Sequence, residues 1–456
     1  MSSYTGFKNL EQLIAKAGGP VKLLRSSQVG AYVFPVVPPE YTNYGDEQYA
    51  WRHGCAFLEL SYHQTDLYVY GPGALPLLSR VGINNFRKFP PKRAKQLVAC
   101  SPDGYLIADG MCFHLEQDYF RIAGSPLISD WVQYNAGNGK YDVELHRDET
   151  VSFRPGDPEI YIFQVQGPLA LEMMRDVTEG TLPEIGFFHI GDIKIKGRNV
   201  RALRHGMAGE HGFELFGPWS EQQIVRDAIY QAGAKYDMKK VGGLAYPMTA
   251  VESAWLALPL PAVYHSEATK PYREWLSPMH IESQASLGGS FYSENVMDYY
   301  VDAYGMGYER FIDFEHDFIG REALKERGKQ PRRKKVTLVW NSDDVTEVIR
   351  ASLFSSDHPA KRIHLPLAAH ATFHYDQVLR GGKHTGTSHF AAYTKNVHAM
   401  LSVAIVNEED SVPGTPVTVL WGETNPMRPN IEKHEVREIR ATVAQAPYFE
   451  KVIKKD

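Results

Sequence analysis

The sequence predicts an α+β protein with more than one domain and a mainly β C-terminal domain. Three observations favour this class. The chain has 456 residues, which is too long for one ordinary hydrophobic core. The same pattern occurs twice: a strand-like run is followed by a break of glycine and proline and then by a run with helical spacing. Towards the C-terminus, β-branched runs replace the helical ones.

The repeated strand–turn–helix unit occurs first at residues 66–80 and again at residues 161–175. The strands are DLYVY (66–70) and YIFQV (161–165), and the helical runs are residues 74–80 and 169–175. We therefore expect two related halves of an α+β scaffold.

A basic segment, KQPRRKK (329–335), separates these halves from the C-terminal region. Its proline and its charges indicate a linker or a solvated turn rather than a nucleic-acid patch. Beyond it, residues 336–340 and 417–421 are β-branched runs, and the second follows the turn Pro413-Gly414-Thr415. These runs predict the β domain.

Charge and cysteine content exclude several function classes. With 49 basic against 54 acidic residues and a net charge of -5, the chain lacks the field that holds nucleic acid or an anionic membrane. The three cysteines, Cys55, Cys100 and Cys112, form no CxxC pair, so we expect neither disulfides nor a thiolate zinc site, and a reducing cytoplasm. No apolar run is long enough to span a membrane. A small molecule is the expected partner.

Common catalytic motifs are absent from the sequence, which contains no GxSxG, HExxH, Walker loop or strand-to-helix GxGxxG. His370 and His374 are four residues apart and could share a helix face. Because no third ligand follows at helical spacing, we expect no metal site.

Glu214 lies in a glycine-rich loop that runs into a strand, GMAGEHGFELFGP (206–218). In a strand its side chain points away from the face of Phe213. A carboxylate there could accept N–H groups from a flat heterocycle. The alternative is an exposed strand glutamate.

Tyr246 lies in GGLAYPMTAVESAW (242–255), where glycines lead to Tyr246 and Pro247 fixes a turn. Val251, Ala254 and Trp255 have helical spacing, so Tyr246 is expected at the start of a helix. The alternative is a packed core tyrosine.

Together these segments resemble the aminomethyltransferase (glycine-cleavage T-protein) superfamily over nearly the whole chain. The matching segments are GYLIADGMCF (104–113), FQVQGP (163–168), GEHGFEL (209–215), FEHDFIGREAL (314–324) and SVAIVNEEDSVPGTPVTVLWG (402–422). The resemblance implies a three-domain folate-binding fold around a central channel. It divides the chain into residues 1–60 with 151–265, residues 61–150 with 266–325, and residues 330–456.

The positions at which the sequence departs from the aminomethyltransferases indicate a different substrate as the methyl donor. Tyr246-Pro247 stands where those enzymes have Arg-Asp. Six segments instead resemble the bacterial tetrahydrofolate-dependent O-demethylases of lignin-derived aromatics, which act on vanillate, 3-O-methylgallate or syringate. These are GAYVFPVVPPEY (30–41), RHGMAG (204–209), AYPMTAVESAW (245–255), PYREWL (271–276), GGSF (288–291) and DYYVDAYGMGY (298–308).

The resemblance implies a role for each matching residue. Tyr246 matches the tyrosine required for demethylation, Tyr32 and His63 match the lining of the aromatic pocket, and Gln164, Glu214, Trp255 and Asp109 match positions near the folate. Ser125 stands where the vanillate enzyme holds an arginine for the substrate carboxylate. Arg121 is a candidate substitute, and the alternative is a solvated strand arginine.

We therefore expect a cytoplasmic, monomeric methyltransferase that moves a methyl group from a methoxylated aromatic acid to N5 of tetrahydrofolate, without a metal. Tyr246 would donate a proton or a hydrogen bond to the ether oxygen, and His63 would orient the ring oxygens of the substrate. The missing arginine favours syringate over vanillate. The alternatives are a non-aromatic methyl donor and a non-enzymatic folate-binding protein. The last class relies on a central cysteine motif that this chain lacks.

Overall fold

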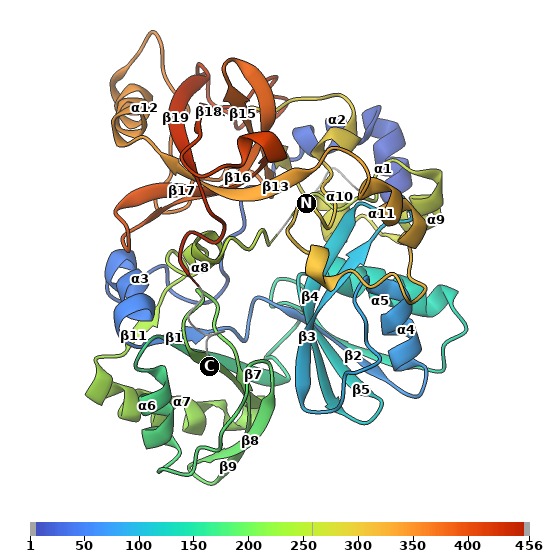
Figure 1. Cartoon of the computed structure of the whole chain (residues 1–456), viewed down its shortest axis with the longest axis vertical. Helices are drawn as coiled ribbons and strands as arrows, with labels where there is room; N and C mark the ends of the chain where they lie inside the picture. Colours follow the sequence, from blue (N-terminus) through green and yellow to red (C-terminus); the bar gives the residue numbers. More distant parts are fainter. Residues whose placement is uncertain (1–5, 258, 451–456) are drawn as a thin grey trace.

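The computed structural model describes residues 6–257 and 259–450. Two mixed α/β units and a closed β-barrel surround the short helix α8 (Met248–Ser253), as Figure 1 shows. The α+β class and the β-rich C-terminal domain predicted from the sequence are confirmed. No helix in the described ranges has the length and apolar character needed to cross a membrane.

The first unit contains a six-stranded sheet whose two faces differ in chemistry. Along β10, Phe213 and Leu215 point to a face covered by α6 (Ala170–Val177) and α7 (Gln222–Gly233). Glu214 and Phe216 point to the opposite face, as the alternation predicted. The strand order is β11 (Lys239–Val241), β1 (Ala56–Glu59), β7 (Ile160–Gln166), β10 (Gly212–Pro218), β9 (Arg198–Arg204) and β8 (Ile190–Ile195).

The second unit contains a five-stranded antiparallel sheet. Its outer face packs on α4 (Ala74–Val81) and α5 (Pro126–Asn138) through a core of aliphatic and aromatic side chains. The strand order is β3 (Arg93–Cys100), β4 (Leu106–Glu116), β5 (Tyr119–Gly124), β2 (Thr65–Tyr70) and β6 (Glu144–Asp148). Both predicted strand–turn–helix units are confirmed, as β2 with α4 and as β7 with α6.

The C-terminal unit is a closed barrel with α12 (Ser342–Phe354) at its side. Its strand order is β13 (Arg333–Trp340), β17 (Ala399–Asn407), β16 (Lys383–Thr394), β15 (Asp376–Arg380), β18 (Pro416–Trp421) and β19 (Arg437–Ala444). The basic segment predicted as a linker is one only in part, because Arg333–Lys335 already pair with β17.

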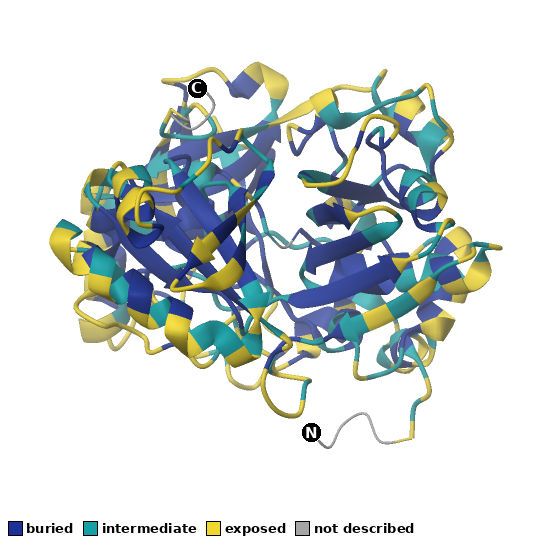
Figure 2. Cartoon of the chain, turned by 90° about the horizontal axis from the view of Figure 1, so that it is seen from below, coloured by how far each residue is buried: buried dark blue, intermediate teal, exposed yellow. Residues whose placement is uncertain are grey.

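The remaining helices connect the units, and a short parallel pair, β12 (Leu287–Gly288) with β14 (Phe373–His374), joins the second unit to the barrel. These helices are α1 (Leu10–Ala17), α2 (Pro20–Ser26), α3 (Tyr44–His53), α9 (Lys270–Trp275), α10 (Ile281–Gln284) and α11 (Arg321–Arg327). Figure 2 shows the strands mostly buried and the exposed residues mostly on helices and loops. The domain boundaries given above stay a prediction.

One apolar cluster joins the three units around α8. The first sheet contributes Leu58 and Phe216, the second contributes Phe113, and the barrel contributes Leu401. Met248 of α8 packs among them. The inner faces of the two sheets therefore meet the barrel at α8, and the candidate site lies there.

The DFIGREAL segment (317–324), part of one of the segments that resemble the family, has a packing role. Gly320 has φ +81°, and a Cβ atom there would overlap with the carbonyl oxygen of Ser101. Phe318 and Leu324 are buried. A Cβ atom at Gly104 would stand 2.6 Å from the Leu324 nitrogen. This segment thus fixes α11 against the second sheet.

Candidate active site

Tyr246 and His63 form a hydrogen-bonded pair. The Tyr246 hydroxyl lies 2.8 Å from His63 Nε2, and His63 Nδ1 lies 3.0 Å from the carbonyl oxygen of Leu60. Since a carbonyl only accepts, Nδ1 carries the hydrogen, Nε2 accepts, and Tyr246 donates. Burial lowers the pKa of His63 to about 4, so the imidazole is neutral at physiological pH.

Phe34 packs against both members of this pair. Its ring centroid lies 4.4 Å from that of Tyr246 and 4.6 Å from that of His63. Phe34 belongs to the segment 30–42, here called the aromatic loop, which also carries the partly exposed Tyr32. Tyr32 and His63 were expected to line an aromatic pocket and Tyr246 was expected as the catalytic tyrosine, and the structure brings all three together with Phe34.

Burial raises the pKa of Tyr246 well above its usual value, and the nearby Tyr32 and Glu214 raise it further. An ordinary phenol has a pKa of about 10. Tyr246 therefore keeps its proton at physiological pH, and its hydroxyl donates to His63 Nε2.

Asp109 is held through one of its two oxygens. Its Oδ2 accepts hydrogen bonds from Trp255 Nε1 at 3.1 Å, from the Tyr308 hydroxyl at 2.9 Å and from the Gln96 side-chain amide. Burial raises the pKa of Asp109 and these three donors oppose the rise. Its Oδ1 is buried and has no hydrogen-bond partner among the described residues.

Glu214 and Gln164 are direct neighbours on β10 and β7. Gln164 donates to the carbonyl oxygen of His205 at 3.0 Å. In the described part of the chain, Gln164 Oε1 and Glu214 Oε1 are buried without a hydrogen bond. Burial raises the pKa of Glu214 and Arg121 opposes the rise. The alternative of an exposed strand glutamate is wrong.

Arg121 lies between the two sheets with no exposed surface, so the alternative of a solvated strand arginine is wrong. Its Nε donates to Asp66 at 2.8 Å, and its guanidinium lies 4.2 Å and 4.8 Å from the ring centroids of Phe113 and Phe216. Nη2 lies 3.5 Å from Glu214. Within the described residues, Nη1 and Nη2 make no hydrogen bond.

Ser125 occupies the N-cap position of α5, directly after β5, and its side chain does not cap the helix. The structure therefore brings five of the predicted site residues into two groups, places three others between the sheets and leaves Ser125 at a helix end. Tyr32, His63 and Tyr246 form one group, and Asp109 with Trp255 forms the second. Gln164, Glu214 and Arg121 lie between the sheets.

Helix α8 connects the two groups. Tyr246 lies two residues before it and Trp255 two residues after it. The prediction that the helix includes Trp255 is wrong, because Ala254 has φ 51° and its N–H bonds to Ala250 and Val251, which ends the helix. This turn allows the Trp255 side chain to reach Asp109.

Three residues of the site were missed from the sequence: Phe34, Gln96 and Tyr308. Phe34 and Tyr308 lie inside segments that carry the resemblance, but their side chains were not singled out. The signal for Gln96 is one polar residue in an otherwise apolar strand run, QLVAC.

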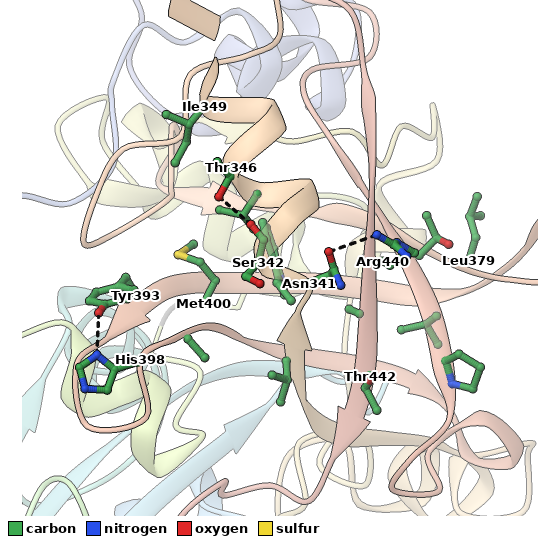
Figure 3. Close-up of a pocket in the computed structure, with 18 of the residues that line it drawn as sticks. Asn341, Ser342, Thr346, Ile349, Leu379, Tyr393, His398, Met400, Arg440 and Thr442 are labelled. Atoms are coloured by element: carbon green, nitrogen blue, oxygen red, sulfur yellow. Dashed lines mark hydrogen bonds between the residues drawn. The ribbon is translucent and has the colours of Figure 1, made fainter. Parts of the chain in front are cut away.

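Two other features of the molecule lie apart from these residues. A cavity of about 960 Å³ lies in the barrel between α12 and its neighbouring strands (Figure 3), and none of its lining residues belongs to the two groups above. His370 and His374 do not share a helix, and His374 instead contacts Asp376 at 2.9 Å. Over residues 6–257 and 259–450, no cluster of three or more His, Cys, Asp or Glu side chains could hold a metal ion.

Comparison with known proteins identifies the family. Residues 28–259 match the model of the GCVT N-terminal domain. The chain is 38% identical to a syringate O-demethylase of Sphingobium sp., over 97% of this chain and 96% of that protein. The chain belongs to the aminomethyltransferase (GCVT) family. It is also 29% identical to a sesamin methylene transferase of Sinomonas sp., over 91% of each chain.

The aminomethyltransferase fold is supported independently by a solved structure. The crystal structure of glycine cleavage system aminomethyltransferase T from Bartonella henselae superposes with a TM-score of 0.61 at 16% identity, covering 97% of both chains. The family, the fold and the methyltransferase class expected from the sequence are thus confirmed.

The site fits tetrahydrofolate, the co-substrate that this family membership implies. A reduced pterin presents several N–H groups along one edge. Asp109 Oδ1 and Gln164 Oε1 are buried acceptors that make no hydrogen bond with the described residues, and Glu214 Oε1 lies 3.5 Å from Arg121 Nη2. Because an unsatisfied buried acceptor costs about 1–3 kcal/mol, a donor-rich ligand would stabilise this arrangement.

Proposed function

We propose that this enzyme removes a methyl group from a methoxylated aromatic acid and transfers it to tetrahydrofolate, giving a phenol and 5-methyltetrahydrofolate. The similarity to a syringate O-demethylase over nearly the full length of both chains supports this reaction. Tyr246 in place of the Arg-Asp pair of aminomethyltransferases supports an ether oxygen, rather than an amine, as the group at the reacting carbon.

On the aryl side, Phe34 and Tyr32 would line the ring and Tyr246 would donate a hydrogen bond to the ether oxygen. The bond strengthens as negative charge grows on that oxygen while the methyl group leaves. A raised pKa suits this role, because the hydroxyl keeps its hydrogen at physiological pH. His63 is neutral and accepts at Nε2.

On the folate side, Asp109, Gln164 and Glu214 would accept N–H groups of the pterin, and Trp255 would pack beside it. Tetrahydrofolate supplies the nucleophilic nitrogen N5 that accepts the methyl group. Trp255 keeps Asp109 in place through its indole N–H, so the folate site depends on the residue that follows α8.

We further propose that Arg121 binds the carboxylate of the aromatic acid. Its Nε donates to Asp66 and its Nη2 is paired with Glu214 Oε1 at 3.5 Å, while Nη1 makes no hydrogen bond within the described residues. The N–H groups of Nη1 can donate charge-assisted hydrogen bonds to a carboxylate. Ser125, at the N-terminus of α5, is the weaker candidate, because a hydroxyl offers one donor and no charge.

The observation that carries the proposed function is the position of α8. Tyr246, which belongs to the aromatic group, lies just before this six-residue helix. Trp255, which donates to Asp109, lies just after it. A methyl donor held at one group and an acceptor held at the other would therefore be kept in a fixed relation, which is the main requirement of a direct transfer.

The test is anaerobic incubation of the purified protein with tetrahydrofolate and one of syringate, vanillate or 3-O-methylgallate. Phenol product and 5-methyltetrahydrofolate should appear in equal amounts, with syringate as the preferred substrate. Demethylation without folate would exclude the cofactor role. Folate binding without transfer from any aryl ether would exclude the aryl donor.

A second candidate is removal of a methylene bridge from a methylenedioxyaryl compound. The 29% identity to a sesamin methylene transferase over 91% of both chains favours it. Adding a methylenedioxybenzoate and a sulfonium donor to the same panel separates this reaction, and the non-aromatic alternative, from O-demethylation. A monomeric state and a cytoplasmic location stay predictions.

A further inference from the structure

Glu47 is a fully buried carboxylate on α3 that touches neither group of the candidate site. Its Oε1 accepts the backbone N–H groups of Tyr41 at 2.7 Å and Thr42 at 2.9 Å, at the end of the aromatic loop. Its Oε2 accepts the N–H of Gly242 at 2.7 Å. Gly242 begins residues 242–247, here called the Tyr246 turn. One side chain thus joins two segments that are 200 residues apart in the sequence.

Direct backbone contacts also join the aromatic loop to the Tyr246 turn, and together with Glu47 they form the junction between these two segments. The N–H of Gly243 donates to Pro38 at 2.9 Å and the N–H of Leu244 donates to Pro39 at 3.0 Å. A Cβ atom at Gly242 would overlap with the carbonyl oxygen of Pro39. The aromatic loop and the Tyr246 turn are therefore packed backbone against backbone.

We propose that Glu47 is a positioning residue for methyl transfer, which holds the aromatic loop against the Tyr246 turn and so sets Phe34 against Tyr246. This inference rests on the proposed function. Phe34 lies on the aromatic loop, Tyr246 on the turn, and their ring centroids are 4.4 Å apart. A shift between the two segments changes the aryl pocket directly. The folate-side contact of Trp255 with Asp109 lies beyond the other end of α8.

A carboxylate suits this position because it only accepts hydrogen bonds, and charge-assisted bonds to N–H groups are about twice as strong as neutral ones. In Glu47→Gln the shape is kept, but the amide nitrogen cannot accept. Either the N–H of Gly242 or those of Tyr41 and Thr42 would then face another donor. The substitution therefore weakens the junction without removing volume from the core.

Glu40 provides a matched control. It lies on the aromatic loop, is exposed, and accepts one backbone N–H, that of Tyr44, at 2.7 Å. Glu40→Gln makes the same chemical change on the same loop without touching the Tyr246 turn. The two variants differ in whether the carboxylate joins the two segments.

The experiment measures kcat, KM for the aryl ether, and Kd for tetrahydrofolate in the parent, Glu47→Gln and Glu40→Gln. We expect kcat of Glu47→Gln to fall roughly 10- to 100-fold, as for a misplacement of about 1 Å. KM for the aryl ether should rise, Kd for tetrahydrofolate should stay within about twofold of the parent, and Glu40→Gln should behave like the parent. Parent-like kinetics of Glu47→Gln would overturn the proposal. Equal losses of folate and aryl ether affinity would overturn it too, since they would indicate general destabilisation.

Amide hydrogen exchange gives a readout that does not depend on turnover. In Glu47→Gln, residues 41–42 and 242–244 should exchange faster together, while Glu40→Gln should affect residue 44 alone. If the parent transfers no methyl group from any aryl ether, the proposed function fails, and the exchange pattern then decides whether the junction exists. Unchanged exchange at residues 242–244 would refute it.

Discussion

The Tyr246 hydroxyl has one hydrogen, and in the structure His63 Nε2 accepts it. To donate to an ether oxygen, the hydroxyl must rotate away from His63, which leaves Nε2 without a donor. A substrate hydroxyl next to the methoxy group can take the vacated place. Syringate and vanillate both carry such a hydroxyl, so the pair indicates a preference for methoxyphenols over aromatic acids that carry only methoxy groups.

A direct comparison of vanillate with 3,4-dimethoxybenzoate tests this preference. We expect kcat/KM to be roughly 10- to 100-fold higher for vanillate, because an unsatisfied buried acceptor costs about 1–3 kcal/mol. In His63→Leu the acceptor is absent, and the ratio of the two kcat/KM values should approach one. A parent enzyme that does not discriminate would contradict this role of His63.

Tyr246→Phe is the second prediction at the residue scale. The variant keeps the ring that packs on Phe34 and loses the donor, so kcat should fall roughly 10²- to 10³-fold while tetrahydrofolate affinity stays unchanged. Tyr300→Phe is the control, because it removes a buried hydroxyl that accepts the Tyr264 N–H in the second unit. It should lower stability by about 1 kcal/mol without changing kcat. Full turnover in Tyr246→Phe would remove the tyrosine from the mechanism.

Single residues were predictable where a local pattern marks them. The strand alternation placed Glu214 on the face opposite Phe213, and the glycines before Tyr246 marked its turn. Phe34, Gln96 and Tyr308 were not predictable in this way, because their roles arise from contacts over long separations. Tyr308 reaches Asp109 across 199 residues, and no local spacing contains that information.

At the scale of elements, helix α8 is too short to be stable by itself and is held by its neighbours. Glu252 on this helix accepts hydrogen bonds from Trp51 Nε1 at 2.8 Å, Thr394 Oγ1 at 2.6 Å and Asn396 Nδ2 at 2.8 Å. Trp51 belongs to α3, and the other two belong to the barrel unit. Helical spacing predicted the existence of α8, but its end and its anchor depend on these other elements.

Strand β10 gives the prediction at the element scale. A Cβ atom at Gly212 would stand 2.7 Å from the His205 oxygen and 2.8 Å from Gln164 Nε2. Gly212→Ala should therefore displace the Gln164 amide and weaken tetrahydrofolate binding about tenfold, the effect of losing one hydrogen bond. A binding titration with 5-methyltetrahydrofolate measures this.

Gly137→Ala is the matched control for Gly212→Ala. Gly137 is exposed in α5, and a Cβ atom there meets no atom within 4 Å. The substitution should raise stability by about 0.5–1 kcal/mol, because alanine loses less backbone entropy in a helix, and leave folate affinity unchanged. Unchanged folate affinity in Gly212→Ala would show that the Gln164 amide does not contact the ligand.

At the scale of the whole molecule, the sequence predicted the class of the fold and the β-rich C-terminal unit, because periodicity and β-branched runs are local properties. The order of the strands was not derivable from those patterns. It follows from pairings such as β1 with β11, which join segments about 180 residues apart. The resemblance to the family implied the three-domain fold but no order of strands.

Acid stability is a prediction for the whole molecule. Burial, together with nearby His374 and Lys361, lowers the pKa of His370 to about 2, and burial with His374 and Arg333 lowers that of His389 to about 3. Both imidazoles are neutral in the folded barrel, whereas in the unfolded chain they bind protons below pH 6.5. The contribution of each group is therefore fully present above pH 6.5 and is lost as the pH falls towards the folded value.

Each imidazole should lower the free energy of unfolding by about 1.4 kcal/mol per pH unit below about pH 6. Chemical denaturation between pH 7.5 and 4.5 measures how the free energy of unfolding changes with pH in the parent and in His389→Gln. The slope of the variant should be smaller by about 1.4 kcal/mol per pH unit, the contribution of one proton. Equal slopes would mean that His389 is already protonated in the folded protein. A comparison at pH 7.5 isolates the packing effect of the substitution.

The anchoring of α8 to the barrel also orders events during synthesis. Thr394 follows Glu252 by 142 residues, so at 5–20 residues per second the ribosome adds it on the order of 10 s later. Until then the helix beside Tyr246 lacks its barrel contacts. The nascent chain thus carries Tyr246 beside a helix without its barrel contacts until Thr394 and Asn396 have been added, and methyl-transfer competence is expected only once the barrel unit has been made.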